Sequence, residues 1–497
     1  MSFFKTALFF ALFLSSRATF SQASLPPLTD SIDSKILNET RGLQVIMPKS
    51  YTPGSNEKFE VVYILDGEWY YELVPFTYNF AESAHYIPKS MFVLIRNRYR
   101  DGVNLRSRDF SPTKIPEDPI SGGADKFYDF LTKEVVPYVE SKYPVNGHRT
   151  LVGSSFSGLF SVYSFVKDPA FFDSYVASDP NIVYDNHYVS RIANKTLDAL
   201  PADAGTLFIG CLVNTSRDMG SYGFDSVLQK HAPKSMHWKV VQYPEESHYS
   251  VQLKAFYDAF RFSHGGYGVT PKIHPLTGII NRPKEFFLLF TDDAPGARFT
   301  ADGSVPDSTS PQMMGGGSVS IISPAKIRVK SSGNRPEYSN EWTFSFEKGK
   351  LNPSNKKAGA GLHYAVYTVA SDSLPAMLPA HAEKSGRVDS TFQLASLIES
   401  KPTLVVLEGS ITIPEDAEYI FYCNGYDAME FELAGKQLMK GQNIPGGDSY
   451  VASLTKGIYP VKLNVVRKAG DMPPIFLIFQ AKPEKEKWWE GAPWKKY

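Results

Sequence analysis

Apolar and polar positions in the first half of the chain follow two different periods. Runs that are almost wholly apolar, such as FEVVYILDG at 59–67 and SMFVLIRNR at 90–98, predict buried strands. The segment 124–143 instead repeats its apolar residues at helical spacing, which predicts a helix with one buried face. Further strands are expected at 149–153, 173–180, 206–213 and 237–244, and further helices from about Gly158, near 188–200 and at 250–260. Strands alternating with helices predict a mostly parallel sheet that is covered on both faces.

The pattern changes from about Glu285 onward. Short alternating strands are separated by turns rich in Gly, Ser and Pro, and almost no helical period remains. A polar, Gly-containing stretch at 349–361 is typical of a linker and divides this all-β part in two. The chain is therefore expected to be multidomain, with an α/β part followed by two β domains.

Composition is consistent with several folded domains. The chain has 497 residues, which is too long for one core, and 42% of them are hydrophobic and 14% aromatic. Its formal net charge is zero. Because no basic field is present, the charge gives no support for a nucleic acid or an anionic membrane as partner.

The first residues have the layout of a secretory signal peptide. Residues 1–23 contain Lys5, an apolar run at 7–14 and small residues leading to Ala23. A membrane span needs roughly 20 apolar residues, so this run is too short to be one, and no other segment is apolar enough. We therefore expect an exported protein, periplasmic or extracellular. Its two cysteines, Cys211 and Cys423, lie in different predicted domains and are expected to be buried free thiols.

The segment TLVGSSFSGLF at 150–160 follows a strand and precedes a helix. A strand, Gly-x-Ser and a helix are the components of a nucleophile elbow, in which Ser155 occupies a sharp turn that only small neighbours permit. Ser157 stands where a second glycine is usual, so the motif departs slightly from Gly-x-Ser-x-Gly. The turn also places the Phe156 N–H at a helix N-terminus, where it could stabilise an oxyanion.

A serine needs a base and a group that orients the base. His248, in PEESHYSV between the last strand and the last helix of the α/β part, has the position and chain order of that base. Asp218 is the expected acid because it follows the strand at 206–213 closely. Asp225 is the alternative, Asp218 could equally cap the next helix, and a Ser–His pair without a third group remains open.

The second oxyanion donor is expected in the loop after the first central strand. Gly67 lies there, and its N–H could point into the site. Trp69 and Tyr70 follow it and could line a substrate pocket, although they could equally belong to the core. No metal-binding or cofactor-binding pattern is apparent, so none is expected.

Residues 35–262 resemble the enterochelin esterase and esterase D group of α/β-hydrolases, which includes carbohydrate esterases of family 1. The resemblance rests on VVYILDGEW, RDFSPT, the segment 122–143, GSSFSGLFSVYSF, ASDPNIVY and PEESHYSV in matching order. It implies an α/β-hydrolase domain at about 24–268 and ester hydrolysis through an acyl-enzyme. By motif it carries over to Ser155 and His248, and it supports Asp218 only by position.

The β-rich part resembles two other families. Residues 280–348 are similar to the small immunoglobulin-like β-sandwich at the C-terminus of chitobiases, on APGARFTADGSVPD and AKIRVKSSG. Residues 362–484 are similar to PA14 β-barrels, on IPEDAEYIFY and AGKQL, and a charged, Trp-rich tail follows at 485–497. Sugar-binding PA14 members hold calcium with two adjacent aspartates. Here the matching pair is Tyr426-Asp427, which puts calcium-assisted glycan binding in doubt.

Three functions remain open from the sequence. The first is an exported serine esterase acting on acetyl or feruloyl esters of carbohydrate, which the appended domains favour. The second is a siderophore trilactone esterase, for which the arginines at 96, 98, 100, 106 and 108 could contact catecholate groups. The third is a glycan-binding or adhesion protein in which the hydrolase domain is only a scaffold.

Overall fold

A computed structural model describes most of the chain and divides it into two compact units, one ending at His264 and the other beginning at Gly265. The described residues are 28–201, 203–212, 219–268, 271, 273–281, 285–290, 296–313, 318–322, 325–353, 361–388, 394–397, 401–442, 447–467 and 474–481. The predicted signal peptide and the whole of the predicted tail lie outside them. Among the described residues, no helix combines the length and apolar character needed to cross a bilayer.

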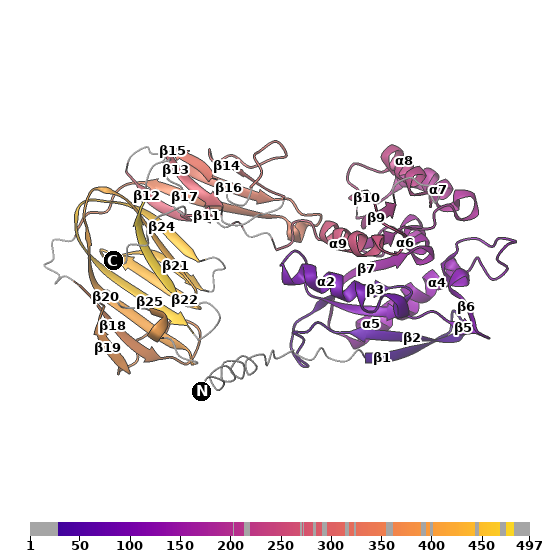
Figure 1. Cartoon of the computed structure of the whole chain (residues 1–497), viewed down its shortest axis with the longest axis horizontal. Coiled ribbons are helices and arrows are strands. Elements are labelled where there is room, and N and C mark those ends of the chain that lie inside the picture. The colour runs from indigo at the N-terminus through magenta and orange to yellow at the C-terminus, as the bar shows by residue number, and fades with distance from the viewer. Residues whose placement is uncertain are drawn as a thin grey trace, which may run out of the picture. The chain divides into compact units, whose positions relative to one another are not determined.

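The first unit is built on an eight-stranded sheet with the order β1-β2-β4-β3-β7-β8-β9-β10 (Figure 1). The pairs β1–β2 and β2–β4 are antiparallel, and the other neighbours are parallel. The strands are β1 (Leu28–Ser34), β2 (Glu39–Ile46), β3 (Phe59–Ile64), β4 (Ser90–Ile95), β7 (Val145–Ser154), β8 (Ser174–Ser178), β9 (Thr206–Leu212) and β10 (Trp238–Tyr243). A short hairpin of β5 (Tyr99–Arg100) and β6 (Val103–Asn104) follows β4.

Helices cover both faces of this sheet. They are α1 (Gly67–Tyr70), α2 (Leu73–Ser83), α3 (Arg106–Phe110), α4 (Ala124–Phe130), η1 (Leu131–Val135), α5 (Val136–Lys142), α6 (Phe156–Lys167), α7 (Tyr184–Thr196), η2 (Leu197–Ala199), α8 (Ser221–His231) and α9 (Val251–Ser263). Successive side chains of β3 point to opposite faces. Val61 and Tyr63 pack with α4 to α8, whereas Val62 and Ile64 pack with α2 and α9. An apolar core therefore covers each face of the sheet, and the central strands are buried on both sides, as the unbroken apolar runs predict.

The strands expected from the sequence are present in this unit. The two N-terminal strands, α2 and α8 were not expected. The helix after the serine begins at Phe156 rather than near Gly158, because the turn at the serine is tighter than a loop would be.

The strand order reverses between β3 and β7. The chain leaves β3 for β4 on one side, and from β7 it continues to β8 on the other side. In open α/β sheets, ligands bind outside the carboxyl ends of the strands at such a reversal. Ser155 follows β7 directly, and Gly67 lies three residues after the end of β3.

The second unit contains the other described strands. They are β11 (Ile273–His274), β12 (Thr277–Ile280), β13 (Glu285–Phe290), β14 (Ala297–Thr300), β15 (Ser318–Ile322), β16 (Ala325–Ser331), β17 (Asn340–Lys348), β18 (Gly361–Thr368), β19 (Lys384–Arg387), β20 (Thr403–Ile413), β21 (Ala417–Asn424), β22 (Ala428–Leu433), β23 (Lys436–Gln442), β24 (Asp448–Leu454), β25 (Gly457–Arg467) and β26 (Ile475–Gln480). Two short 3₁₀ turns, η3 (Pro336–Tyr338) and η4 (Leu394–Leu397), interrupt them.

These strands form a three-stranded, a seven-stranded and a six-stranded sheet. Side chains of the seven-stranded sheet, such as Phe421 and Tyr450, share one core with Val405 and Val465 of the six-stranded sheet. The two sheets therefore pack face to face as a sandwich, where the sequence suggested a barrel.

The two expected β domains are joined by a common sheet. β12 pairs with β17 of the region 280–348 on one side and with β24 of the region 362–484 on the other. Figure 1 shows β12 and β17 beside β24 and β21. The seven-stranded sheet thus crosses the predicted boundary at 349–361, and the β-rich half is one compact unit rather than two separate modules.

Candidate active site

Ser155 occupies a strained turn between β7 and α6. Its backbone has φ 56 and ψ −114, a conformation that a non-glycine residue rarely adopts. Gly153 makes the turn possible, because a Cβ there would lie 2.2 Å from the carbonyl oxygen of Ser157. The Ser155 N–H donates to Ser178 O at 3.0 Å, which fixes the turn against the end of β8. The geometry is that of the nucleophile elbow expected from the sequence.

The departure of Ser157 from glycine also has a structural reason. The Ser157 hydroxyl is buried, donates to Ser154 O and accepts from Ser154 N, both at 2.9 Å. The close backbone approach that needs a glycine occurs instead at Gly158, one position after Ser157. A Cβ at Gly158 would lie 3.2 Å from Cα of Pro180, so this glycine lets the loop after β8 pack against α6.

His248 lies within hydrogen-bond distance of Asp179. The distance from His248 Nδ1 to Asp179 Oδ2 is 2.6 Å, and the side chains are 28% and 3% exposed. A buried carboxylate at this distance holds the Nδ1–H tautomer, which leaves Nε2 to act as a proton acceptor. The imidazole is thus oriented and partly open to solvent, as a general base requires.

Backbone contacts place Asp179 beside Ser155. Ser154 and Ser178 are register partners in the parallel pair β7–β8, and Asp179 and Ser155 are the next residues along each strand. The Asn181 N–H also donates to Ser155 O at 3.0 Å, so the loop that carries Asp179 wraps around the serine turn. Ser155, Asp179 and His248 consequently share one edge of the sheet.

The acid beside His248 is a residue that the sequence analysis did not select. Asp218 lies outside the described residues. Asp225 lies on α8, where its Oδ2 accepts from Gln229 Nε2 at 2.8 Å. Asp179 follows a strand directly and lies between Ser155 and His248 in the chain, so the order of Ser, acid and His could have included it. The expectation placed the acid after β9, whereas the acid that contacts His248 follows β8.

The two expected oxyanion donors are the first residues of two helices. Phe156 begins α6 and Gly67 begins α1. Leu65 N–H donates to Val152 O at 3.0 Å, so the segments leading to Gly67 and Ser155 leave adjacent strands side by side. A Cβ at Gly67 would lie within 2.9 Å of the Ile95 N, which explains a glycine at this turn. Their role as donors remains a prediction.

The two expected pocket residues have different surroundings. Trp69 is 50% exposed, whereas Tyr70 is 7% exposed and its ring packs edge-on against Phe256. Burial raises the pKa of Tyr70, a shift that a hydrogen bond with Ser154 opposes. Gln252 Nε2 donates to both Tyr70 Oη and Ser154 Oγ at 3.3 Å. Tyr70 is thus part of the support beneath the serine turn, and Trp69 remains a candidate for substrate contact.

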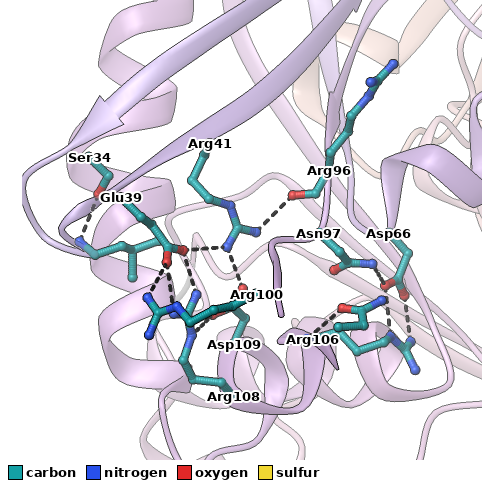
Figure 2. Close-up of polar contacts among 12 residues, drawn as sticks. Ser34, Glu39, Arg41, Asp66, Arg96, Asn97, Arg100, Arg106, Arg108 and Asp109 are labelled. Atoms are coloured by element: carbon teal, nitrogen blue, oxygen red, sulfur yellow. Dashed lines mark hydrogen bonds and ion pairs between the residues drawn. The ribbon is translucent and has the colours of Figure 1, made fainter. Parts of the chain in front are cut away.

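The arginines of the loop region after β4 have two kinds of environment, shown in Figure 2. Arg108 binds Glu39 at 2.6 Å and Asp109 at 2.7 Å, and fully buried Arg41 also binds Asp109 at 2.6 Å. Burial opposes ionisation of Glu39, but hydrogen bonds from Arg108 and Arg41 outweigh it and lower the pKa of Glu39. These charges are already matched by acids.

Arg106 likewise binds an acid, Asp66, at 2.7 Å, and the remaining three arginines are exposed. Arg100 lies 4.0 Å from Glu39 with 63% of its side chain exposed, and Arg96 donates to Gln44 at 3.2 Å. Together with Arg98, they give the β4–β5 segment a basic surface. Within the described ranges, no three His, Cys, Asp or Glu side chains come together so as to hold a metal ion.

The chain is similar to known esterases over its N-terminal part. Residues 34–196 match the family described as "Putative esterase". The ferri-bacillibactin esterase BesA of Bacillus subtilis is 28% identical over 169 residues, which cover 31% of this chain and 58% of that protein. A siderophore enterobactin esterase of Emericella nidulans is 36% identical over 87 residues, 17% of this chain and 29% of that protein.

A likeness also exists among solved structures. An IroE-like serine hydrolase from Shewanella oneidensis is 29% identical with a TM-score of 0.42, covering 48% of this chain and 79% of that one. The chain aligns with about half or less of the length of the two curated relatives. The first unit has the esterase-type α/β-hydrolase fold, and the family match and named relatives support a carboxylic-ester hydrolase.

Proposed function

We propose that the first unit is a serine esterase that hydrolyses carboxylic esters through an acyl-enzyme. The observation that supports this most is the 2.6 Å contact between His248 and Asp179 at the edge where the strained turn of Ser155 lies. A structural histidine would not need a buried acid beside a strained serine. The esterase match of residues 34–196 supports the same conclusion independently.

In this proposal Ser155 Oγ attacks the ester carbonyl while His248 Nε2 accepts its proton. Asp179 accepts the His248 Nδ1–H and stabilises the imidazolium. The N–H groups of Phe156 and Gly67 stabilise the negative oxygen of the tetrahedral intermediate. His248 returns the proton to the leaving alcohol. A water molecule, deprotonated by His248, then releases the acyl group and restores Ser155.

The proposed substrate is an ester-linked siderophore, a trilactone of the enterochelin type, rather than an acylated carbohydrate. Both curated relatives reported above are named for siderophores. Such ligands carry negatively charged metal-binding groups, and exposed Arg96 and Arg100 provide positive charge in the segment after β4, the strand that neighbours β3. We keep carbohydrate esters as the competing substrate class for the experiment below.

We propose further that the chain is exported, on the layout of residues 1–23. The resemblances of the β-rich unit to chitobiase-type and PA14 domains are kept as proposals about its origin. Asp427, the remaining aspartate of the PA14 pair, contacts Arg467 at 2.8 Å. A guanidinium therefore already neutralises the carboxylate that would hold calcium. This favours a structural role over calcium-dependent glycan binding.

A hydrolysis panel tests the enzyme and its substrate together. Wild type, Ser155→Ala and Ser164→Ala are compared on p-nitrophenyl acetate, methyl ferulate, an acetylated xylan and a catecholate trilactone with and without iron. Ser164 is the matched control, because its buried hydroxyl on the same helix has no hydrogen-bond partner among the described residues. We expect Ser155→Ala to lose turnover by at least ~10³-fold, Ser164→Ala to keep it, and the trilactone to have the highest kcat/KM.

Two results would overturn parts of this proposal. Equal rates for wild type and Ser155→Ala would remove the catalytic assignment and favour a scaffold or binding protein. Serine-dependent turnover with a higher kcat/KM for the ferulate or xylan ester would keep the esterase and replace the substrate class.

A further inference from the structure

We propose that Arg106 is a positioning residue that fixes the two oxyanion donors, Gly67 and Phe156, relative to each other. The inference rests on the proposed function and concerns the same site. The guanidinium of Arg106 binds the residue before Gly67 and also packs against the ring of Phe156. It is thus in contact with both segments whose N–H groups would hold the oxyanion.

The first contact holds a strained turn. Asp66 precedes Gly67 with φ 51 and ψ 43, a left-handed conformation that a non-glycine residue adopts only at an energetic cost. Its carboxylate is fully buried and accepts three hydrogen bonds, from Asn97 Nδ2 at 2.7 Å and from Arg106 Nε at 3.0 Å and Nη2 at 2.7 Å. Figure 2 shows Asn97 and Arg106 converging on Asp66. Because two of the three bonds come from one planar group, they set the orientation as well as the position of the turn.

The second contact reaches the other donor. The Arg106 guanidinium carbon lies 5.7 Å from the centre of the Phe156 ring and 4.8 Å from that of Trp69. Trp69 belongs to the Gly67 turn, since its N–H donates to Asp66 O at 2.8 Å. One guanidinium therefore packs between side chains of both turns, and its cation–π contacts favour that arrangement.

The helix that carries Arg106 is itself anchored. In the same short helix α3, Asp109 pairs with buried Arg41 at 2.6 Å and Arg108 pairs with Glu39 at 2.6 Å. These ion pairs connect α3 to β2, a strand of the central sheet. Arg106 is consequently held from a rigid base, which a group that positions a catalytic turn requires.

The expected effect follows from the sensitivity of oxyanion stabilisation to geometry. Loss of one such donor costs about 10²–10³-fold in kcat, and a displacement of about 1 Å costs of the order of 10²-fold. We expect Arg106→Gln to lower kcat for p-nitrophenyl acetate about 10²-fold and to leave KM within about twofold. Arg106→Lys, which keeps the charge but lacks the two-pronged contact, should stay below a tenth of the wild-type kcat.

Arg149→Gln is the matched control. Arg149 donates to Glu140 at 2.8 Å through Nε, its Nη2 lies 2.7 Å from the same carboxylate, and it packs 5.0 Å from the Phe171 ring. Its side chain is 25% exposed, against 20% for Arg106, and it lies toward the start of β7, several residues before the serine. Loss of a comparable ion pair should lower Tm without changing kcat.

A boronic acid provides a readout that a merely structural role would not change. It forms a tetrahedral adduct on the serine, so its affinity should fall in Arg106→Gln in proportion to kcat/KM and stay unchanged in Arg149→Gln. Wild-type kcat in either Arg106 variant, or a raised KM at unchanged kcat, would overturn the inference while the esterase remains. Absence of Ser155-dependent turnover in the wild type would overturn both.

Discussion

Replacement of Asp179 by asparagine tests the assignment of the acid directly. The change keeps size and shape but removes the charge that contacts His248 Nδ1 at 2.6 Å. With hydrogen-bonded atoms at this distance, the centres of the two charges are about 4 Å apart, and at an effective dielectric of ~20 their attraction is about 4 kcal/mol. This attraction exists only once His248 is protonated, so it lowers the barrier and not the substrate's binding energy.

An energy of about 4 kcal/mol corresponds to roughly 10³-fold in rate. An asparagine NH₂ facing Nδ1 would also favour the wrong tautomer, so losses up to roughly 10⁴-fold fit the same reasoning. We therefore expect Asp179→Asn to lower kcat for p-nitrophenyl acetate by 10³-fold or more, in order of magnitude, with KM nearly unchanged.

Asp198→Asn is the control for this experiment. Asp198 also contacts a histidine Nδ1, that of His231 at 3.0 Å, but its side chain is 70% exposed. The same substitution there should leave kcat unchanged. Asp218→Asn and Asp225→Asn examine the two acids expected from the sequence. If either of these lost about 10³-fold while Asp179→Asn stayed within tenfold of wild type and folded normally, the reasoning from the 2.6 Å contact would be refuted.

Two further predictions concern stability. Gly153→Ala would place a Cβ 2.2 Å from Ser157 O and should lower the free energy of unfolding, measured by chemical denaturation, by about 3 kcal/mol. Gly223→Ala, with open space at its Cβ on α8, should be neutral or stabilising. Equal effects of the two substitutions would contradict the elbow geometry. Burial opposes ionisation of Asp30, but hydrogen bonds from Lys142 and Tyr138 outweigh it and lower its pKa from 3.8 to about 2. The stabilising effect of the ionised Asp30 is therefore present above about pH 4 and lost as pH falls to 2. Asp30→Asn should lower the free energy of unfolding at pH 6 by no more than about 1 kcal/mol at this surface pair, and the difference in Tm from wild type should vanish near pH 2. A difference in Tm that persists at pH 2 would be inconsistent with this pKa shift.

Much of the first unit could be predicted because its signals are local. Unbroken apolar runs predicted β3, β4 and β9, and Ser155 was selected because strand, glycine, serine and helix are consecutive. His248 was selected by its place after the last strand. Asp179 was missed because its contact depends on backbone conformation. With φ 40, and with its N–H donated to Gly210 O on β9 at 2.6 Å, it turns toward the loop after β10. No residue pattern in ASDPNIVY shows this turn.

The arrangement of strands in the β-rich unit could not be predicted from local signals. Alternating residues and turns predict where strands occur, but not which strands pair. The short strand β12 lies at the very start of the first expected β domain and joins both through β17 and β24, more than a hundred residues apart in the chain. A boundary drawn from composition at 349–361 is therefore a boundary in sequence and not in the sheet.

Backbone strain is one feature of the candidate site, and positive φ also occurs at other described residues. Asp66 after β3, Ser155 after β7, Asp179 after β8 and Glu245 after β10 all have positive φ, at 51, 56, 40 and 69. Each turn brings one proposed group to the edge: the oxyanion donor at Gly67, the nucleophile Ser155, the acid Asp179 and the loop of His248. Such conformations cost roughly 1–2 kcal/mol apiece and persist only where other contacts offset them, as the three hydrogen bonds to Asp66 do. Four of the eleven described non-glycine residues with positive φ thus lie at the same end of β3, β7, β8 and β10. Their shared location is explained if each turn brings one group to a single reaction centre.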